Sequence, residues 1–91
     1  MQEAILDDNC GYDKFYVAER ILEQDLKISF INKLDDFDTL YWNFVIDDHP
    51  LTLRYNIYFG LSVYPTKFKD ASEKDNFKVL EIGEILFRKL K

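Results

Sequence analysis

The chain has 91 residues, of which 47% are hydrophobic and 16% aromatic, and it carries a net charge of −5 at pH 7. This length fits one domain, residues 1–91, and the hydrophobic content excludes a disordered chain. The negative charge disfavours binding to nucleic acids and to anionic membranes. We therefore expect the partner to be another protein or a second copy of the chain.

The N-terminus and the cysteine content indicate the compartment. No apolar run reaches the ~18 residues of a membrane span, and the first residues lack the positive charges that begin a signal peptide. Cys10 is the only cysteine, so no internal disulfide forms, as is usual in a reducing compartment. These features predict a cytoplasmic protein.

Residues 1–12 are compatible with two structures. The apolar run 4–6 is followed by polar residues, and it fits either a short helix or a strand added to the edge of a sheet. Asp13 is suited to be an N-cap, and the pattern after it predicts an amphipathic helix that ends near Gln24. The apolar residues that recur at helical spacing are Phe15, Ala18, Ile21 and Leu22.

Three strands are predicted, over residues 27–34, 39–47 and 51–64. Apolar residues occupy the even positions of the second strand and the odd positions of the third, so each presents one apolar face. Burying both faces requires even positions to pair with odd ones across the acidic turn. The expected pairs are Ile46 with Leu51, Phe44 with Leu53, Trp42 with Tyr55 and Leu40 with Ile57. Gly60 predicts a bulge or a bend inside the third strand.

The last helix is predicted to begin near Asp70 or Ser72, where capping-box spacings occur, and to run to the end of the chain. These elements predict an α+β fold with two layers, α-β-β-β-α, in which a three-stranded antiparallel meander carries two helices on one face. Phe37, in the turn before the second strand, is expected to fold back toward the core. The expected core residues are Leu22, Trp42, Phe44, Leu53, Tyr55, Ile57, Ile82 and Leu86.

Residues suited to catalysis are scarce. One histidine and one cysteine cannot form a His/Cys metal site of three or four ligands, and three glycines provide no phosphate-binding loop. His49 follows Asp47 and Asp48, and an Asp–His pair can act as a base, but the sequence places no nucleophile beside it. We therefore predict no catalytic residue, no metal ligand and no cofactor, and we expect a non-enzymatic protein.

Acidic residues gather at both ends of the predicted sheet. The turn at 47–48 lies at the end where the last helix brings its cations, and the turn at 35–38 lies at the end where Lys67 and Lys69 are expected. We expect nearby cations to neutralise both clusters. The alternative is that the cluster at the 47–48 end binds calcium or a basic partner.

The uncovered sheet face is the predicted binding surface. The parity that buries the apolar rows leaves five polar and aromatic residues on this face: Tyr41, Asn43, Arg54, Asn56 and Tyr58. In the predicted register, Asn43 faces Arg54, and Tyr41 faces Asn56. Tyrosine and arginine are enriched in protein interfaces. The alternatives are that these residues only stabilise the sheet as cross-strand pairs, or that residues 1–12 cover them.

The sequence therefore favours a small acidic protein-binding module that uses the open sheet face, either as a homodimer or as a binder of the inhibitor or immunity type. A second hypothesis is a ligand-binding or enzymatic domain with a pocket between the helices and the sheet near Trp42. A third is an acidic mimic of nucleic acid, which requires a long stripe of unpaired carboxylates. A flat aromatic patch distinguishes the first hypothesis from the cleft of the second.

Overall fold

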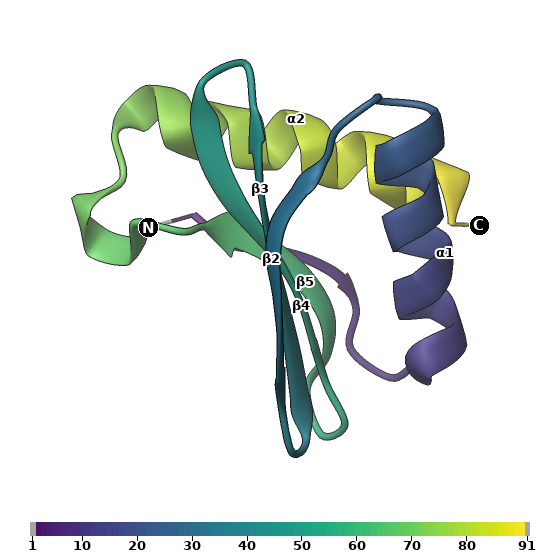
Figure 1. Cartoon of the computed structure of the whole chain (residues 1–91). Coiled ribbons are helices and arrows are strands. Elements are labelled where there is room, and N and C mark those ends of the chain that lie inside the picture. The colour runs from purple at the N-terminus through teal and green to yellow at the C-terminus, as the bar shows by residue number, and fades with distance from the viewer. Residues whose placement is uncertain (1, 91) are drawn as a thin grey trace.

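The computed structural model describes residues 2–90, and it has two helices packed on one face of a five-stranded antiparallel sheet (Figure 1). Met1 and Lys91, the ends of the predicted N-terminal segment and last helix, lie outside the described residues. The elements are β1 (Ala4–Asp7), α1 (Tyr12–Gln24), β2 (Phe30–Asp36), β3 (Thr39–Ile46), β4 (His49–Asn56), β5 (Gly60–Pro65), a 3-10 turn (Phe68–Asp70) and α2 (Glu73–Lys89). The strand order is β1-β5-β4-β3-β2. The predicted α+β class is confirmed, and no helix among the described residues is long and apolar enough to cross a membrane.

The predicted third strand, 51–64, is wrong, because it is two strands joined by a tight turn at 57–59. The Asn56 side-chain oxygen accepts hydrogen bonds from the backbone N–H groups of Tyr58 (2.7 Å) and Phe59 (3.0 Å). Gly60 closes the turn with a φ of 85°, a conformation that glycine adopts without steric cost. Ile57, which was expected in the core, lies in this turn and is exposed.

The N-terminal segment forms the fifth strand, which is one of the two structures expected for it. β1 lies at the sheet edge and pairs with β5, Ala4 opposite Val63. At the other edge, β2 begins at Phe30 rather than at residue 27. Lys27 adopts a positive φ of 57° as the chain leaves α1, and this conformation does not fit a strand.

The faces of the β3–β4 hairpin are as predicted, but the pairing is displaced by two residues. Asp47 and Asp48 have φ values of 50° and 67°, so they form a two-residue turn of the kind that matches the twist of a hairpin. The observed pairs are Ile46 with His49, Phe44 with Leu51, Trp42 with Leu53 and Leu40 with Tyr55. A displacement of two residues leaves every side chain on its predicted face, because the side-chain period of a strand is two.

The core between helices and sheet contains all the expected residues except Ile57. Trp42 is at its aromatic centre, with ring centroids 4.6 Å from Phe15 and 5.7 Å from Phe30. The Lys33 ammonium lies 4.4 Å from the Trp42 ring centroid and forms an ion pair with Glu19 (2.9 Å). The indole thus links β3, β2 and α1.

Trp42→Ala is expected to reduce the free energy of unfolding by about 3–5 kcal/mol, because it removes a buried ring and leaves a cavity between α1 and the sheet. Denaturant unfolding measures this change. Phe37→Ala, which truncates an exposed ring, is the matched control and should change stability by less than about 0.5 kcal/mol. A loss below about 1 kcal/mol for Trp42→Ala would contradict the assigned core.

Gly60→Ala is expected to destabilise the protein by about 2 kcal/mol or more, because a residue with a side chain is strained at this φ. A Cβ there would also lie 2.1 Å from the backbone oxygen of Asp7. Gly11→Ala is the control, since a Cβ at Gly11 meets no atom within 4 Å. Equal thermal stability of the two variants would show that the β4–β5 turn does not form as described.

Candidate functional site

The five predicted site residues are divided between two places. Tyr41, Asn43, Arg54 and Asn56 lie half-buried on the outer face, the sheet face opposite the helices. Tyr58 lies in the β4–β5 turn and is exposed. The expected cross-strand neighbours are wrong: Tyr41 is opposite Arg54, and Asn43 is opposite Thr52. The displaced hairpin register described above accounts for this difference.

Asn43 belongs to a line of hydrogen bonds that crosses the outer face. Its amide nitrogen donates to Asn32 Oδ1 (2.7 Å), and its side-chain oxygen accepts from the Thr52 hydroxyl (2.6 Å). The Thr52 hydroxyl also lies 2.8 Å from that of Thr66. These bonds join β2, β3, β4 and the end of β5, so the Asn43 side chain already has partners within the sheet.

Arg54 joins the middle of the outer face to the N-terminal segment. Its Nη2 donates to a Glu3 carboxylate oxygen at 2.7 Å, and its guanidinium lies 5.4 Å from the Tyr64 ring centroid. Burial raises the pKa of the Tyr64 hydroxyl, so the ring stays neutral beneath the guanidinium. Arg54 Nε and the hydroxyl of the neighbouring Ser62 are buried and have no hydrogen-bond partner among residues 2–90.

Asn56 fixes two neighbouring turns. Besides its bonds within the β4–β5 turn, its amide nitrogen donates to the Thr39 hydroxyl (2.8 Å) at the β2–β3 turn. The backbone N–H of Ile57 donates to the carbonyl of Asp38 (3.1 Å). The two turns therefore lie side by side at one end of the sheet, the lower end in Figure 1.

These two turns expose a cluster of large apolar side chains, which we name the aromatic tip. Its residues are between 45% and 98% exposed: Phe37, Ile57, Tyr58 and Phe59. Phe37 is the most exposed of them and has a positive φ of 55°, a conformation that is rare for an aromatic residue. The expectation that Phe37 folds back to the core is wrong, because the two-residue turn points it away from the sheet.

A hollow of about 430 Å³ connects the aromatic tip with the outer face. Tyr58 and Phe59 line it together with Arg54 and Ser62, and Glu3, Ile5 and Asp8 complete its wall. Arg54 and Tyr58 are thus the two predicted site residues that the structure brings together around one space. Ile57 and Phe59 were wrongly assigned to the buried row of a continuous strand, and Phe37 was expected to fold back toward the core, so the sequence did not predict their exposure.

Carboxylates beside the aromatic tip lack cations. No ion pair joins Asp35, Asp36 or Asp38 to any cation within residues 2–90. The expected neighbours, Lys67 and Lys69, are at the opposite end of the sheet, because the β4–β5 turn reverses the chain. The expected neutralisation is therefore wrong for this cluster.

At the opposite end, the expected neutralisation is found only in part. Lys78, near the start of α2 rather than in its last turn, contacts Asp47 (2.8 Å), and Lys89 contacts Asp25 (3.1 Å). Asp48 forms no ion pair within residues 2–90. The hydrogen bond from Lys78 lowers the pKa of Asp47. Three carboxylates without an ion pair within residues 2–90, Asp35, Asp36 and Asp38, thus lie together beside the aromatic tip.

The only histidine is part of a helix cap. His49 Nδ1 lies 2.6 Å from a carboxylate oxygen of Asp75, rather than beside Asp47 or Asp48. Asp75 is buried and forms a capping box with Ser72, the N-cap of α2. The bonds from His49 and from the Ser72 backbone N–H lower the pKa of Asp75. This Asp–His pair therefore anchors α2 to β4.

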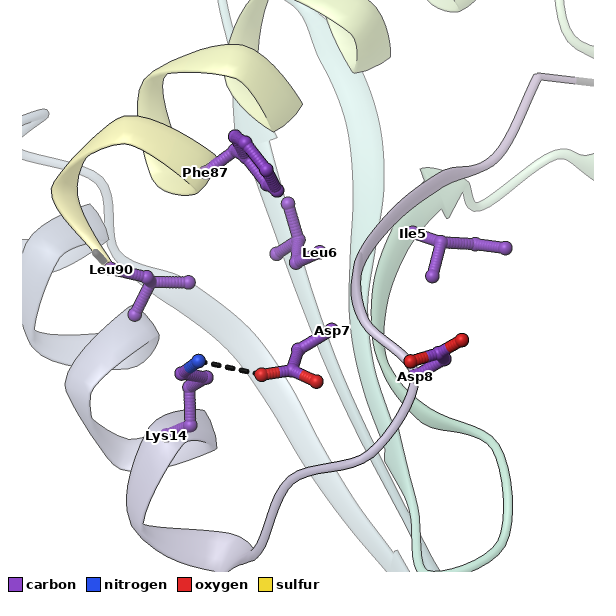
Figure 2. A pocket seen from close by; sticks show the side chains of 7 residues that line it. All are labelled: Ile5, Leu6, Asp7, Asp8, Lys14, Phe87 and Leu90. Atoms are coloured by element: carbon purple, nitrogen blue, oxygen red, sulfur yellow. Dashed lines mark hydrogen bonds and ion pairs between the residues drawn. The ribbon is translucent and has the colours of Figure 1, made fainter.

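A hollow of about 460 Å³ lies between β1, α1 and α2. Figure 2 shows the side chains that line it. Its walls combine apolar residues, among them Leu6 and Leu90, with an ion pair between Lys14 and Asp7 (2.6 Å). Lys14 lowers the pKa of Asp7 by its hydrogen bond. Within residues 2–90, no group of three or more potential metal ligands lies together.

Comparison of the chain with protein-family models, with curated proteins and with solved structures finds no match.

The Asp75 interactions predict a specific pH dependence. The pKa of Asp75 is lowered in the folded state, so its stabilising contribution is present above the ordinary pKa of 3.8 and is lost as the pH falls through the folded value. Asp75→Asn should therefore lower the melting temperature at pH 7, and the difference from the wild type should shrink below pH 3.8. Asp70→Asn, at an exposed carboxylate, is the control. A difference between Asp75→Asn and the wild type that is independent of pH would contradict this account.

Proposed function

We propose that the chain is a non-enzymatic protein-binding module of the inhibitor or immunity type, and that it docks on a basic partner protein through the aromatic tip. The observation that carries the proposal is the exposure of four large apolar side chains on two adjacent turns. Turns are ordinarily built from small and polar residues, which are well solvated there. Apolar clusters exposed at such positions are typical of contact sites.

The geometry of the aromatic tip favours tight binding. Both turns are held by hydrogen bonds to the backbone: Asn56 accepts within its own turn, and Ile57 donates to Asp38 in the other. A surface that is already rigid loses little conformational entropy when it binds. Aromatic side chains on a rigid support are the residues that most often dominate binding energy.

The charges beside the aromatic tip indicate the kind of partner. Asp35, Asp36 and Asp38 flank Phe37 and form no ion pair with any cation in the described part of the chain. A basic surface with an apolar recess complements this arrangement, and such complementarity speeds association and excludes acidic partners. Arg54 contributes to the proposed binding surface because it lines the same hollow as Tyr58. Its guanidinium remains paired with the Glu3 carboxylate.

Two observations favour this proposal over the alternatives. The space around Trp42, where a ligand pocket was expected, is filled by the rings of Phe15, Tyr16 and Phe30. A mimic of nucleic acid needs a long stripe of unpaired carboxylates, whereas Asp47 and Asp25 at the far end are paired with lysines.

The double variant Tyr58→Ser/Phe59→Ser tests the proposal. It removes two exposed rings but keeps the backbone N–H groups that Asn56 binds, so the fold should survive. The immobilised wild type should retain a basic protein from an extract of the source cells, and the double variant should retain at least about tenfold less of it. Raising the salt concentration should release the partner, because the flanking charges are exposed.

Ile31→Ser is the matched control, since it removes an equally exposed apolar side chain from the opposite end of the sheet. This control should retain the partner as the wild type does. The proposal fails if the double variant, with an unchanged circular dichroism spectrum, retains the same protein as the wild type. It also fails if the retained partner is acidic.

A further inference from the structure

A continuous groove runs along the free edge of β1 and the neighbouring side of α2; we name it the edge groove. Three adjoining hollows form it, with volumes of about 270, 640 and 460 Å³. They are continuous because the first two share Leu80, and the last two share Ile5, Leu6 and Phe87. β1 pairs only with β5 among the described strands, so its other edge faces this groove.

β1 and α2 run in the same direction along the edge groove. The backbone N–H of Gln2 donates to the Asn76 side chain (2.9 Å) near the start of α2. Ala4 is so close to Gly83 that a Cβ on this glycine would lie 2.5 Å from the alanine side chain. Leu6 points toward Phe87 near the end of α2 (Figure 2).

We propose that a second copy of the chain occupies the edge groove, with β1 pairing antiparallel to β1 of the other copy and α2 packing antiparallel to its equivalent. A two-fold axis that makes the β1 strands antiparallel also makes the α2 helices antiparallel, because the two elements run together. One symmetry operation therefore satisfies the unpaired strand edge and covers the apolar side of the helix.

The residues of α2 are arranged symmetrically for such a contact. The apolar residues that border the groove are Phe77, Leu80, Phe87 and Leu90. With the two-fold axis between Gly83 and Glu84, Leu80 of one helix lies opposite Phe87 of the other. Phe77 meets Leu90 in the same way. Gly83 is the residue of α2 that lies against Ala4 of β1. Phe77 and Leu80 are 68% and 46% exposed in the single chain, so this contact removes substantial apolar area from water.

The charges of the edge groove suit a second copy better than a strongly charged partner. Six charged residues line its three hollows, and four of them form ion pairs within the chain. These pairs are Lys14 with Asp7 (2.6 Å) and Arg88 with Glu84 (2.6 Å), which leave Asp8 and Glu73 without an ion pair within residues 2–90. The two unpaired carboxylates lie at the two ends of the groove, and its middle hollow carries no unpaired charge, so two copies can approach there with little repulsion.

Leu80→Glu tests the helix contact. Sedimentation of the full chain at about 100 µM should give a dimer, and Leu80→Glu should raise the dissociation constant by about 30-fold or more. Val17→Glu places the same charge on an exposed apolar position of α1 and should leave the dimer intact. A wild type that stays monomeric, as it would if the groove served a strand of another protein, overturns the proposal. So does a dimer that Leu80→Glu leaves unchanged.

Amide hydrogen exchange tests the strand contact. The outward-facing amides of β1 should exchange more slowly in the wild-type dimer than in monomeric Leu80→Glu, whereas amides of the opposite edge strand, β2, should not differ. A dimer in which the exchange of β1 is the same as in Leu80→Glu overturns the proposed pairing. Because the aromatic tip is not part of this contact, Tyr58→Ser/Phe59→Ser should dimerise as the wild type does. If that variant no longer dimerises, the contact lies at the aromatic tip, and this result also overturns the proposal.

Discussion

The chain reversal that ends at Gly60 determines where most of the other elements lie. Only a residue without a Cβ fits there, because its φ is 85° and because the backbone of Asp7 and Asp8 lies where a Cβ would be. Because the chain turns back, β5 lies between β4 and β1, and Pro65 emerges beside the β3–β4 turn. The connection that contains Lys67 and Lys69 therefore lies at that end, and α2 starts there and crosses the inner face. The opposite end therefore keeps its acidic residues and its exposed rings.

The parity of apolar residues predicted which face of each strand is buried but could not reveal this reversal. In the β4–β5 hairpin, residues of the same parity face each other, as Leu53 faces Val63. The apolar row at odd positions thus continues through the turn as if the strand were unbroken, and Gly60 suggests only a bulge. The register of the β3–β4 hairpin was missed for another reason. Asp47 and Asp48 both take positive φ without a glycine, and no short-range pattern signals that.

The candidate site could be predicted only in part, because it depends on turns rather than on strands. Arg54 and Tyr58 were expected to share a surface, and they do line one hollow, but Asn43 and Asn56 are engaged in bonds that hold the sheet. A signal for the remaining residues was present in the sequence. Ile57, Tyr58 and Phe59 are three consecutive apolar residues, which breaks the period of two, and Phe37 stands alone among carboxylates.

The two edges of the sheet differ in a way that supports the role given to β1. β2 carries the devices that keep an edge strand from pairing with another chain: a bulge between Phe30 and Asn32, the charged side chain of Lys33, and carboxylates at 35 and 36. The apolar run 4–6 of β1 has no charged side chain, although an apolar edge strand invites pairing. The irregularity of β1 lies at its end, between Ile5 and Asp7, and leaves Ala4 and Ile5 in regular pairing. One protected edge and one open edge are what selective strand pairing requires, since only the open edge can accept a further strand.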